Sequence, residues 1–340
     1  MNYRMLIGSI TVAVAVAVLP LPPCQLHAQT LPEGVVEREI TVPGPVPLPG
    51  TLTLPVGKGP FPGLILVHGS GPGDRDETIG PNKPFRDLAW GLAQQGIVVL
   101  RFDKRAKVQG AWYAGKNFTV YDETIEDALS ALTVLRHEPE VDARRTFQLG
   151  LSLGAMLAPR IGKADGKVAG IIIMAGATRV QVMDQIERQL KYLLSLGGPD
   201  SLALTAQLAG LAPLIAHVRA LKPSDSSDAT PLPGLGGTGT KYWLDLASYD
   251  PAATMRDLHI PALVLQGMRD FQVAPDQLDD WLRVVGPRTD ITVKRYPSLS
   301  HLFIAGTGTP SPADYATAGH VDPQVITDIA AWVRAVDSRK

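Results

Sequence analysis

Cysteine is almost absent from this sequence, since Cys24 is the only one in 340 residues. It lies in the N-terminal segment that we expect to be removed, so the exported chain would hold no disulfide, no thiolate metal site and no thiol nucleophile. A lipid anchor through Cys24 is disfavoured by Pro23 directly before it, where a small residue is expected. An excess of charge is lacking too, because 32 Lys and Arg face 33 Asp and Glu. This balance predicts neither a nucleic acid nor another strongly charged partner.

The N-terminus lacks an apolar run long enough to span a membrane. Arg4 precedes an apolar run at 5–19, which is shorter than the roughly 20 residues of a spanning helix. A positive start, an apolar stretch and the small residue Ala28 before the cut are typical of a secretory signal. We therefore expect residues 1–28 to be a cleaved signal peptide. The protein would be exported, to the periplasm or beyond the cell, with no stable membrane insertion after cleavage.

Strand-like and helix-like patterns alternate along the rest of the chain. Alternating or continuous apolar runs of strand length occur at 35–42, 48–55, 62–69, 97–103, 145–151, 168–177, 260–267 and 290–297. Segments with helical spacing or helix-capping residues occur at 83–96, 119–139, 153–162, 180–196, 201–221, 274–286 and after Asp322. The first two strands are predicted to form an antiparallel hairpin at a sheet edge.

This alternation predicts an α/β protein with a mostly parallel central sheet and helices on both faces. Between 178 and 250 the alternation gives way to two helices and a connector rich in Pro, Gly and Ser. A long structureless loop is uncommon in a compact domain, so we interpret this segment as an inserted helical lid. The predicted organisation is a signal peptide at 1–28, core at 29–177, lid at 178–250 and core again at 251–340.

Ser152 lies between two glycines in "LGLSLGA", where a predicted strand meets a predicted helix. In a nucleophile elbow the serine occupies a sharp strand-to-helix turn, and the residues two before and two after it come too close for side chains. Gly150 and Gly154 hold those two positions. A G-x-S-x-G match alone is weak, but its place between strand and helix makes Ser152 a candidate nucleophile.

A serine nucleophile needs a base, and in this kind of fold the histidine comes last in the chain. His301 directly follows the last predicted strand, which is the place expected for it. His320, in a later loop, is a rival. The other histidines lie in the signal peptide, within predicted helices or before a strand, apart from His68 at the end of the predicted strand at 62–69.

An acid must orient that base, and Asp270 stands just past the end of a buried strand. The carboxyl ends of parallel strands are where such sheets collect functional residues. Asp276, Asp279 and Asp280 are rivals, although the last two fall on the solvated face of a predicted helix. Asp270 is therefore the predicted acid.

The oxyanion formed during acyl transfer needs backbone N–H donors. One is predicted to be Leu153, the residue after the nucleophile, and the other Ser70, in the glycine-rich loop after the strand at 62–69. Gly71 is the alternative to Ser70. The charged segment "DRDE" at 74–77 follows this loop, and we interpret it as a solvated turn rather than part of the rim of the active site.

These motifs give the chain a resemblance to the α/β-hydrolases. Within them it looks like a bacterial group of serine carboxylesterases related to the acyl-CoA thioesterase and dienelactone-hydrolase branches. The resemblance rests on "HGSGPGDRDETIG", "LGLSLGAMLAPRI", "YWLDLASYDP", "LQGMRDFQV" and "HLFIAGTGTP". It implies ester hydrolysis with Ser152, Asp270 and His301 as the catalytic triad. Leu151 and Ala155 depart from the usual pattern beside the serine, and neither position carries a reacting group.

The sequence thus predicts a serine carboxylesterase for short- to medium-chain esters, acting through an acyl-enzyme. The same triad would also serve an acyl-thioester hydrolase, an acyltransferase or a serine peptidase, and a non-catalytic binding protein on this scaffold is a further alternative. No phosphate-cradling motif and no close cluster of metal ligands occurs, so neither cofactor nor metal is expected. The expected partner is a small ester, and the oligomeric state stays open.

Overall fold

The computed structural model describes residues 30–113, 116–178, 182–228, 230, 232 and 237–337. The predicted signal peptide at 1–28 lies outside the described residues.

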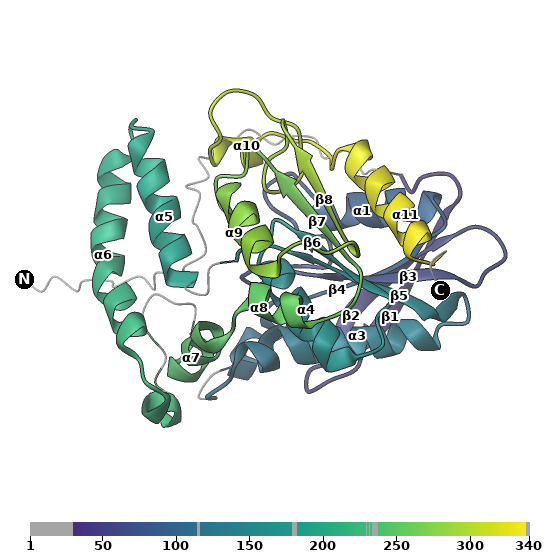
Figure 1. Cartoon of the computed structure of the whole chain (residues 1–340), viewed down its shortest axis with the longest axis horizontal. Helices are drawn as coiled ribbons and strands as arrows, with labels where there is room; N and C mark the ends of the chain where they lie inside the picture. The colour runs from purple at the N-terminus through teal and green to yellow at the C-terminus, as the bar shows by residue number, and fades with distance from the viewer. Residues whose placement is uncertain are drawn as a thin grey trace, which may run out of the picture.

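Eight strands of the described chain form one sheet in the order β1-β2-β4-β3-β5-β6-β7-β8 (Figure 1). They are β1 (Val35–Val42), β2 (Leu48–Pro55), β3 (Phe61–Val67), β4 (Val98–Phe102), β5 (Val141–Leu151), β6 (Gly170–Met174), β7 (Ala262–Gly267) and β8 (Ile291–Tyr296). β1 and β2 form the predicted antiparallel hairpin, and β2 pairs antiparallel with β4. All other neighbours are parallel. The predicted fold class is confirmed.

Helices connect and cover the strands. In the described residues they are α1 (Pro84–Gln94), α2 (Arg105–Val108), α3 (Glu126–His137), α4 (Leu153–Asp165), α5 (Val182–Ser195), α6 (Ser201–Ala220), α7 (Thr240–Ser248), α8 (Pro251–Asp257), α9 (Asp276–Val285), α10 (Ala313–Ala316) and α11 (Pro323–Asp337).

The sheet separates two apolar cores because side chains alternate along each buried strand. On β3, Ile65 and Val67 face a core shared with α3, α4, α8 and α9, while Leu64 and Leu66 face a core shared with α1 and α11. All four side chains are buried. This two-sided burial explains why the central strands read as continuous apolar runs.

The strand order reverses direction at β3. The chain steps from β3 outward to β4 on one side and then crosses over to β5 on the other. In open parallel sheets, such a switch point leaves a crevice at the carboxyl ends of the two strands, where ligands bind. The loops after β3 and β5 begin there, and they carry Ser70 and Ser152.

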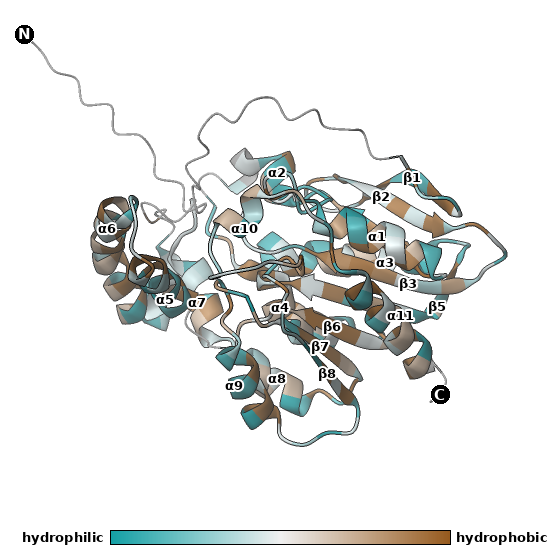
Figure 2. Ribbon diagram, turned by 90° about the horizontal axis from the view of Figure 1, so that it is seen from above, coloured by the Kyte–Doolittle hydropathy of each residue, from teal (hydrophilic) through white to brown (hydrophobic). Residues whose placement is uncertain are grey.

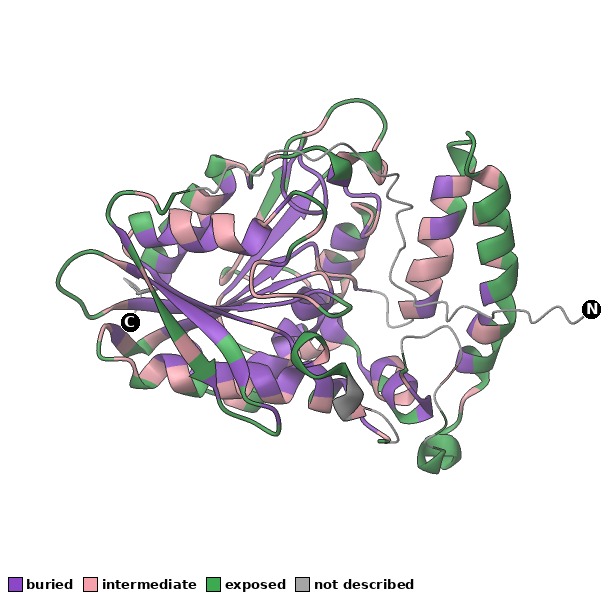
Figure 3. Ribbon diagram, turned by 180° about the vertical axis from the view of Figure 1, so that it is seen from behind, coloured by how far each residue is buried: buried purple, intermediate pink, exposed green. Residues whose placement is uncertain are grey.

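Helices α5 and α6 pack on each other at one side of the molecule, beyond the end of the sheet (Figure 1). α6 is apolar on all sides (Figure 2) and mostly exposed (Figure 3). By length and composition alone it could cross a membrane, and 17% of its apolar window is buried. α5 is amphipathic and buries Met183, Leu190 and Leu193.

Several local features differ from the sequence prediction, among them the following three. The helix predicted at 119–139 begins with a π-helical turn at Tyr121–Ile125, before α3. The short helices α7 and α8 were not predicted at all, because their few residues give too little periodicity. α8 nevertheless has clear local causes, with Pro251 at its first turn and the Asp250 side chain accepting a hydrogen bond from the Ala253 N–H at 2.8 Å.

Truncating the core should cost far more stability than truncating the surface. Phe147 on β5 is fully buried, so Phe147→Ala should lower the free energy of unfolding by about 3–5 kcal/mol. Urea unfolding followed by tryptophan fluorescence measures this. Leu202→Ala is the control, because Leu202 is 83% exposed and its truncation should stay within about 0.5 kcal/mol. Equal costs for both variants would contradict the described core.

Candidate active site

The turn around Ser152 has no room for side chains on either side of the serine. A Cβ built on Gly150 would lie 2.1 Å from the carbonyl oxygen of Gly154, and one on Gly154 would lie 2.3 Å from that of Val67. Ser152 itself has φ +56° and ψ −112°, a conformation that costs a non-glycine residue energy. The elbow therefore depends on both glycines, and it presses the start of α4 against the end of β3.

Backbone strain gathers around this turn. Among the described residues, the non-glycine residues with positive φ are Glu77, Ser152, Ala175 and Phe303. Ala175 directly follows β6, whose Met174 carbonyl accepts the Ser152 N–H at 3.0 Å. Phe303 lies two residues after His301, and Glu77 lies in the loop after β3. Such strain persists where surrounding structure enforces it, and it is typical of functional sites.

The structure brings the predicted base and acid together. His301 Nδ1 lies 2.7 Å from Asp270 Oδ2, and both residues are 3% exposed. The other carboxylate oxygen, Oδ1, accepts the N–H groups of Gln272 and Val273, each at 2.8 Å. The acid is thus fixed by its own loop and holds the imidazole through one nitrogen.

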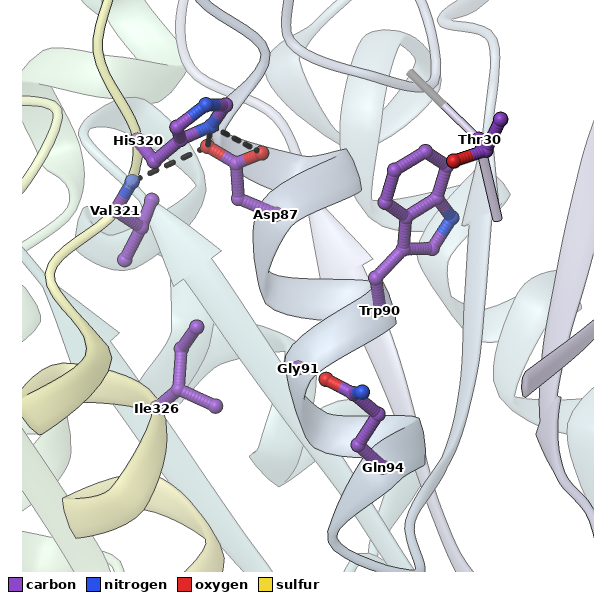
Figure 4. A pocket seen from close by; sticks show the side chains of 8 residues that line it. All are labelled: Thr30, Asp87, Trp90, Gly91, Gln94, His320, Val321 and Ile326. Atoms are coloured by element: carbon purple, nitrogen blue, oxygen red, sulfur yellow. Dashed lines mark hydrogen bonds and ion pairs between the residues drawn. The ribbon is translucent and has the colours of Figure 1, made fainter. Parts of the chain in front are cut away.

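The rival histidine lies elsewhere. His320 faces Asp87 of α1 at 3.2 Å, at a surface pocket that Trp90 and Val321 also line (Figure 4). Its side chain is 61% exposed. Asp276, the nearest acidic rival to Asp270, forms a 2.6 Å ion pair with Arg188. Neither His320 nor Asp276 contacts His301 or Asp270 among the described hydrogen bonds and ion pairs.

The loop after β3 passes over Ser152. A Cβ built on Gly69 would lie 3.4 Å from Ser152 Cβ, which shows how close the Gly69 backbone comes. The N–H of Gly69 donates to Glu77 and that of Ser152 to Met174. Within the described part of the chain, the N–H groups of Ser70 and Leu153 have no such acceptor. At the start of α4, the Leu153 N–H lies beyond the reach of intrahelical bonding.

Glu77 corrects the interpretation of "DRDE" as a solvated turn. Its side chain points inward and is 7% exposed, with Oε1 accepting the Gly69 N–H at 3.1 Å. Its other oxygen, Oε2, is buried without a hydrogen-bond partner among the described residues. Burial raises the pKa of the Glu77 carboxyl to about 7, against the opposing attraction of Lys104. His301 also lowers this pKa slightly through its charge, which has a smaller effect than burial or Lys104.

Asp74 explains locally why this turn bends inward. Its carboxylate accepts the N–H groups of Asp76 and Thr78, and its carbonyl accepts the Glu77 N–H at 2.8 Å. These bonds close a compact turn. Glu77 is then forced to positive φ with its side chain facing the core.

Lys104 is a second site residue that the sequence analysis missed. It is 2% exposed, donates to the Gly69 carbonyl at 3.0 Å and forms a 2.6 Å ion pair with Glu123. Its position in the sequence could have indicated a site residue, because Lys104 stands two residues after β4, at the same edge of the sheet as the loop after β3. Within the charged segment "RFDKR", Lys104 has the composition of an exposed surface residue.

His68 offers no second base at this edge. Its ring is buried between Phe85 and Phe102, with centroids 5.4 and 5.3 Å away. Burial, reinforced by the nearby Lys104, lowers the pKa of His68 to about 3. The ring is therefore neutral at physiological pH, and it bonds to the Asp74 carbonyl at 3.1 Å. No group of three or more His, Cys, Asp or Glu side chains that could hold a metal ion occurs in the described residues.

Comparison with known proteins gives consistent matches. Residues 82–306 match the family model described as serine aminopeptidase, S33. The chain is 40% identical over 302 residues to the esterase EstD of Thermotoga maritima, a match that covers 89% of this chain and 68% of that protein. It is 30% identical over 135 residues to the esterase FrsA of Klebsiella pneumoniae, covering 40% of this chain and 30% of FrsA.

Solved structures with the same fold include hydrolases of several kinds. A proline iminopeptidase from Mycobacterium smegmatis superposes with a TM-score of 0.56 at 16% identity, covering 89% of this chain and 99% of that one. An esterase from Pyrococcus furiosus superposes with a TM-score of 0.55 at 14% identity, covering 88% and 91%. At such low identities the likeness shows the fold alone.

Adding one methyl group at the elbow should destroy the site. Gly154→Ala forces a Cβ to within 2.3 Å of the Val67 carbonyl, so the turn must shift. A displacement of about 1 Å costs on the order of 100-fold in rate, and hydrolysis of p-nitrophenyl acetate should fall at least that much. Gly210→Ala on α6 is the control, because its Cβ would meet open space. A wild-type rate in Gly154→Ala would refute the described turn.

Burial of Glu77 should make stability depend on pH. The folded carboxyl has a raised pKa, so the folded chain binds its proton more tightly and loses stability as pH rises from 4.5 to about 7. Glu77→Gln removes this loss. Relative to wild type, its free energy of unfolding should rise by up to roughly 3 kcal/mol between pH 4.5 and 8.

Urea titrations at both pH values test the effect. Glu33→Gln, at an exposed carboxyl, is the control and should show no such change. A difference between Glu77→Gln and wild type that stays constant with pH would show that the Glu77 carboxyl is not buried as described.

Proposed function

This chain belongs to the serine aminopeptidase S33 family of α/β-hydrolases and is a hydrolase that acts on esters, and we propose that it is a serine carboxylesterase with Ser152, Asp270 and His301 as its triad. The observation that carries the proposal is the buried 2.7 Å contact between His301 and Asp270, in a chain whose Ser152 occupies a strained elbow. Its substrates would be short- to medium-chain carboxylic esters.

The proposed mechanism uses these three groups in turn. His301 takes the proton of the Ser152 hydroxyl, and the serine oxygen attacks the ester carbonyl. His301 then protonates the departing alcohol, which leaves an acyl-enzyme. Water, activated by the same histidine, releases the acid. Asp270 keeps the imidazole in the tautomer that leaves its other nitrogen free to accept the proton.

The developing oxyanion would be held by the backbone N–H groups of Ser70 and Leu153. Their availability supports this assignment, because the neighbouring amides of Gly69 and Ser152 are already bound. Gly71, at φ +92°, is the alternative donor in the same loop. Two donors at such a site account for a large share of the rate of acyl transfer.

The preference for short or medium acyl chains rests on the segment 178–250, which we propose is a lid. Leu190 and Leu193 on α5 and Leu211 on α6 are buried, so these apolar side chains are already used in packing. Side chains that pack within this segment do not at the same time line a pocket for a long acyl chain. Export, which we infer from the N-terminal signal, places the enzyme away from cytoplasmic acyl-CoA and favours oxygen esters over thioesters.

A p-nitrophenyl ester series from acetate to palmitate tests the proposal. The rate should peak at short or medium chains and fall by at least roughly 10⁴-fold in Ser152→Ala and in Asp270→Asn. His320→Gln is the control for the base and should retain activity, whereas His301→Gln should not. A peak at palmitate would refute the chain-length preference.

Amide and thioester substrates separate the alternatives. Aminoacyl p-nitroanilides turned over faster than any ester would identify a peptidase, and acyl thioesters turned over faster would identify a thioester hydrolase. Full esterase activity in Ser152→Ala would overturn the proposed nucleophile.

A further inference from the structure

The backbone of Gly69 is held from both sides by buried, oppositely charged side chains. Its N–H donates to Glu77 Oε1 at 3.1 Å, and its carbonyl accepts from Lys104 Nζ at 3.0 Å. Glu77 is 7% exposed and Lys104 is 2% exposed. Burying two ionisable groups costs folding free energy. That both bind the backbone of one residue next to Ser152 therefore calls for an explanation.

We propose that Glu77 and Lys104 are positioning residues of the oxyanion site, which together fix the Gly69–Ser70 peptide so that the Ser70 N–H faces the developing oxyanion. This inference rests on the proposed function, because it takes Ser152 as the nucleophile and Ser70 as a donor. It adds two residues that act through the backbone and touch no substrate.

The geometry of the peptide unit supplies the first argument. In a planar trans peptide, the carbonyl of one residue and the N–H of the next point in opposite directions. Lys104 holds the Gly69 carbonyl toward the buried interior. The Ser70 N–H must therefore point away from Lys104, and Ser70 is itself exposed. Fixing the carbonyl thus fixes the direction of the donor.

The role of Glu77 is complementary. By accepting the Gly69 N–H, it prevents this amide from turning toward the substrate and leaves the next one, Ser70, to do so. A Cβ on Gly69 would lie 3.0 Å from Glu77 Oε1 and 3.4 Å from Ser152 Cβ. Gly69 is therefore enclosed between the Glu77 carboxyl and Ser152. The hydrogen bonds that hold it lie next to the proposed nucleophile.

Both side chains are themselves held in place. Lys104 pairs with Glu123 at 2.6 Å, and Glu123 lies in the π-helical turn before α3. The N–H of Lys104 donates to the Gly73 carbonyl at 3.0 Å, which ties the far end of the same loop. Such π-helical turns are frequent at functional sites, and here one directs a carboxylate to the ammonium.

The charges also strengthen the donor. Hydrogen bonds along a chain of groups polarise one another. A cationic donor on the Gly69 carbonyl draws electron density from the peptide, so the Ser70 N–H becomes a better donor. An oxyanion site needs donors that are already oriented before charge develops, and this arrangement provides one.

The test compares substrate binding with binding of an oxyanion mimic. Glu77→Leu keeps volume but cannot accept the Gly69 N–H, and Lys104→Met releases the Gly69 carbonyl. In both variants, kcat for p-nitrophenyl acetate should fall by roughly 10- to 100-fold. This loss should not exceed the loss of rate caused by removing an oxyanion donor outright. KM should stay within about twofold. The inhibition constant of an aryl trifluoromethyl ketone, whose adduct carries an oxyanion, should rise by the same factor as kcat/KM falls.

Titration of active sites with diethyl p-nitrophenyl phosphate corrects every rate for misfolded protein. Asp127→Asn is the matched control, because Asp127 is a buried carboxyl paired with Arg105 outside this loop. It should lose stability while kcat per titrated site and the ketone constant stay within twofold. Glu77→Gln, which keeps an acceptor oxygen, should recover most of the activity lost in Glu77→Leu.

The outcomes separate this inference from the function on which it rests. If the phosphate does not label Ser152 in the wild-type protein, the proposed function fails. If Ser152 is labelled but kcat and the ketone constant stay within twofold in Glu77→Leu and Lys104→Met, the positioning role is wrong. If those variants do not fold, Glu77→Asp is used instead, because it withdraws the carboxylate by one methylene. Its kcat and its ketone inhibition constant then decide whether Glu77 has the positioning role.

Discussion

A single close backbone crossing underlies the arrangement of this molecule. The end of β3, the end of β5 and the first turn of α4 meet where Gly150 and Gly154 leave no space for a Cβ. Because Gly154 touches the carbonyls of Val67 and His68, the elbow that carries Ser152 cannot move without the loop that carries Ser70. One steric constraint thus sets two parts of the candidate site at once. The sheet topology, with its switch point at β3, brings those strand ends together.

Behind this crossing the protein buries several ionisable side chains. Glu77, Lys104 and Glu123 are nearly inaccessible, yet each is tied to backbone or to an opposite charge. Replacing buried ion pairs with apolar residues often stabilises proteins, so their presence points to orientation rather than to stability. The positive φ of Glu77 agrees with this view, since strain and buried polarity occur together in the same loop.

Much of the fold could be predicted, and the candidate triad residues could be chosen, because both follow local or topological rules. The buried strand β7 reads as an apolar run, and Asp270 follows it by three residues, whereas His301 comes five residues after the more exposed strand β8. Glu77 could not be predicted in this way. "DRDE" has the composition of a solvated turn, and its inward bend depends on the hydrogen bonds of Asp74 and on Lys104, far along the chain. When the burial of a side chain depends on partners far along the chain, no hydrophobic periodicity in the sequence indicates it.

The segments that follow Asp270 and His301 also contact α5. Gln185 of α5 donates to the carbonyl of Gln272, two residues after Asp270, and Tyr192 donates to the carbonyl of Pro310 at 2.8 Å, in the chain that follows His301. Polar contacts of this kind exchange readily with water, whereas the cores beneath the sheet do not. α5 is held by such polar contacts as well as by its buried Met183, Leu190 and Leu193. The position of α5 is therefore linked, through these contacts, to the segments that follow Asp270 and His301.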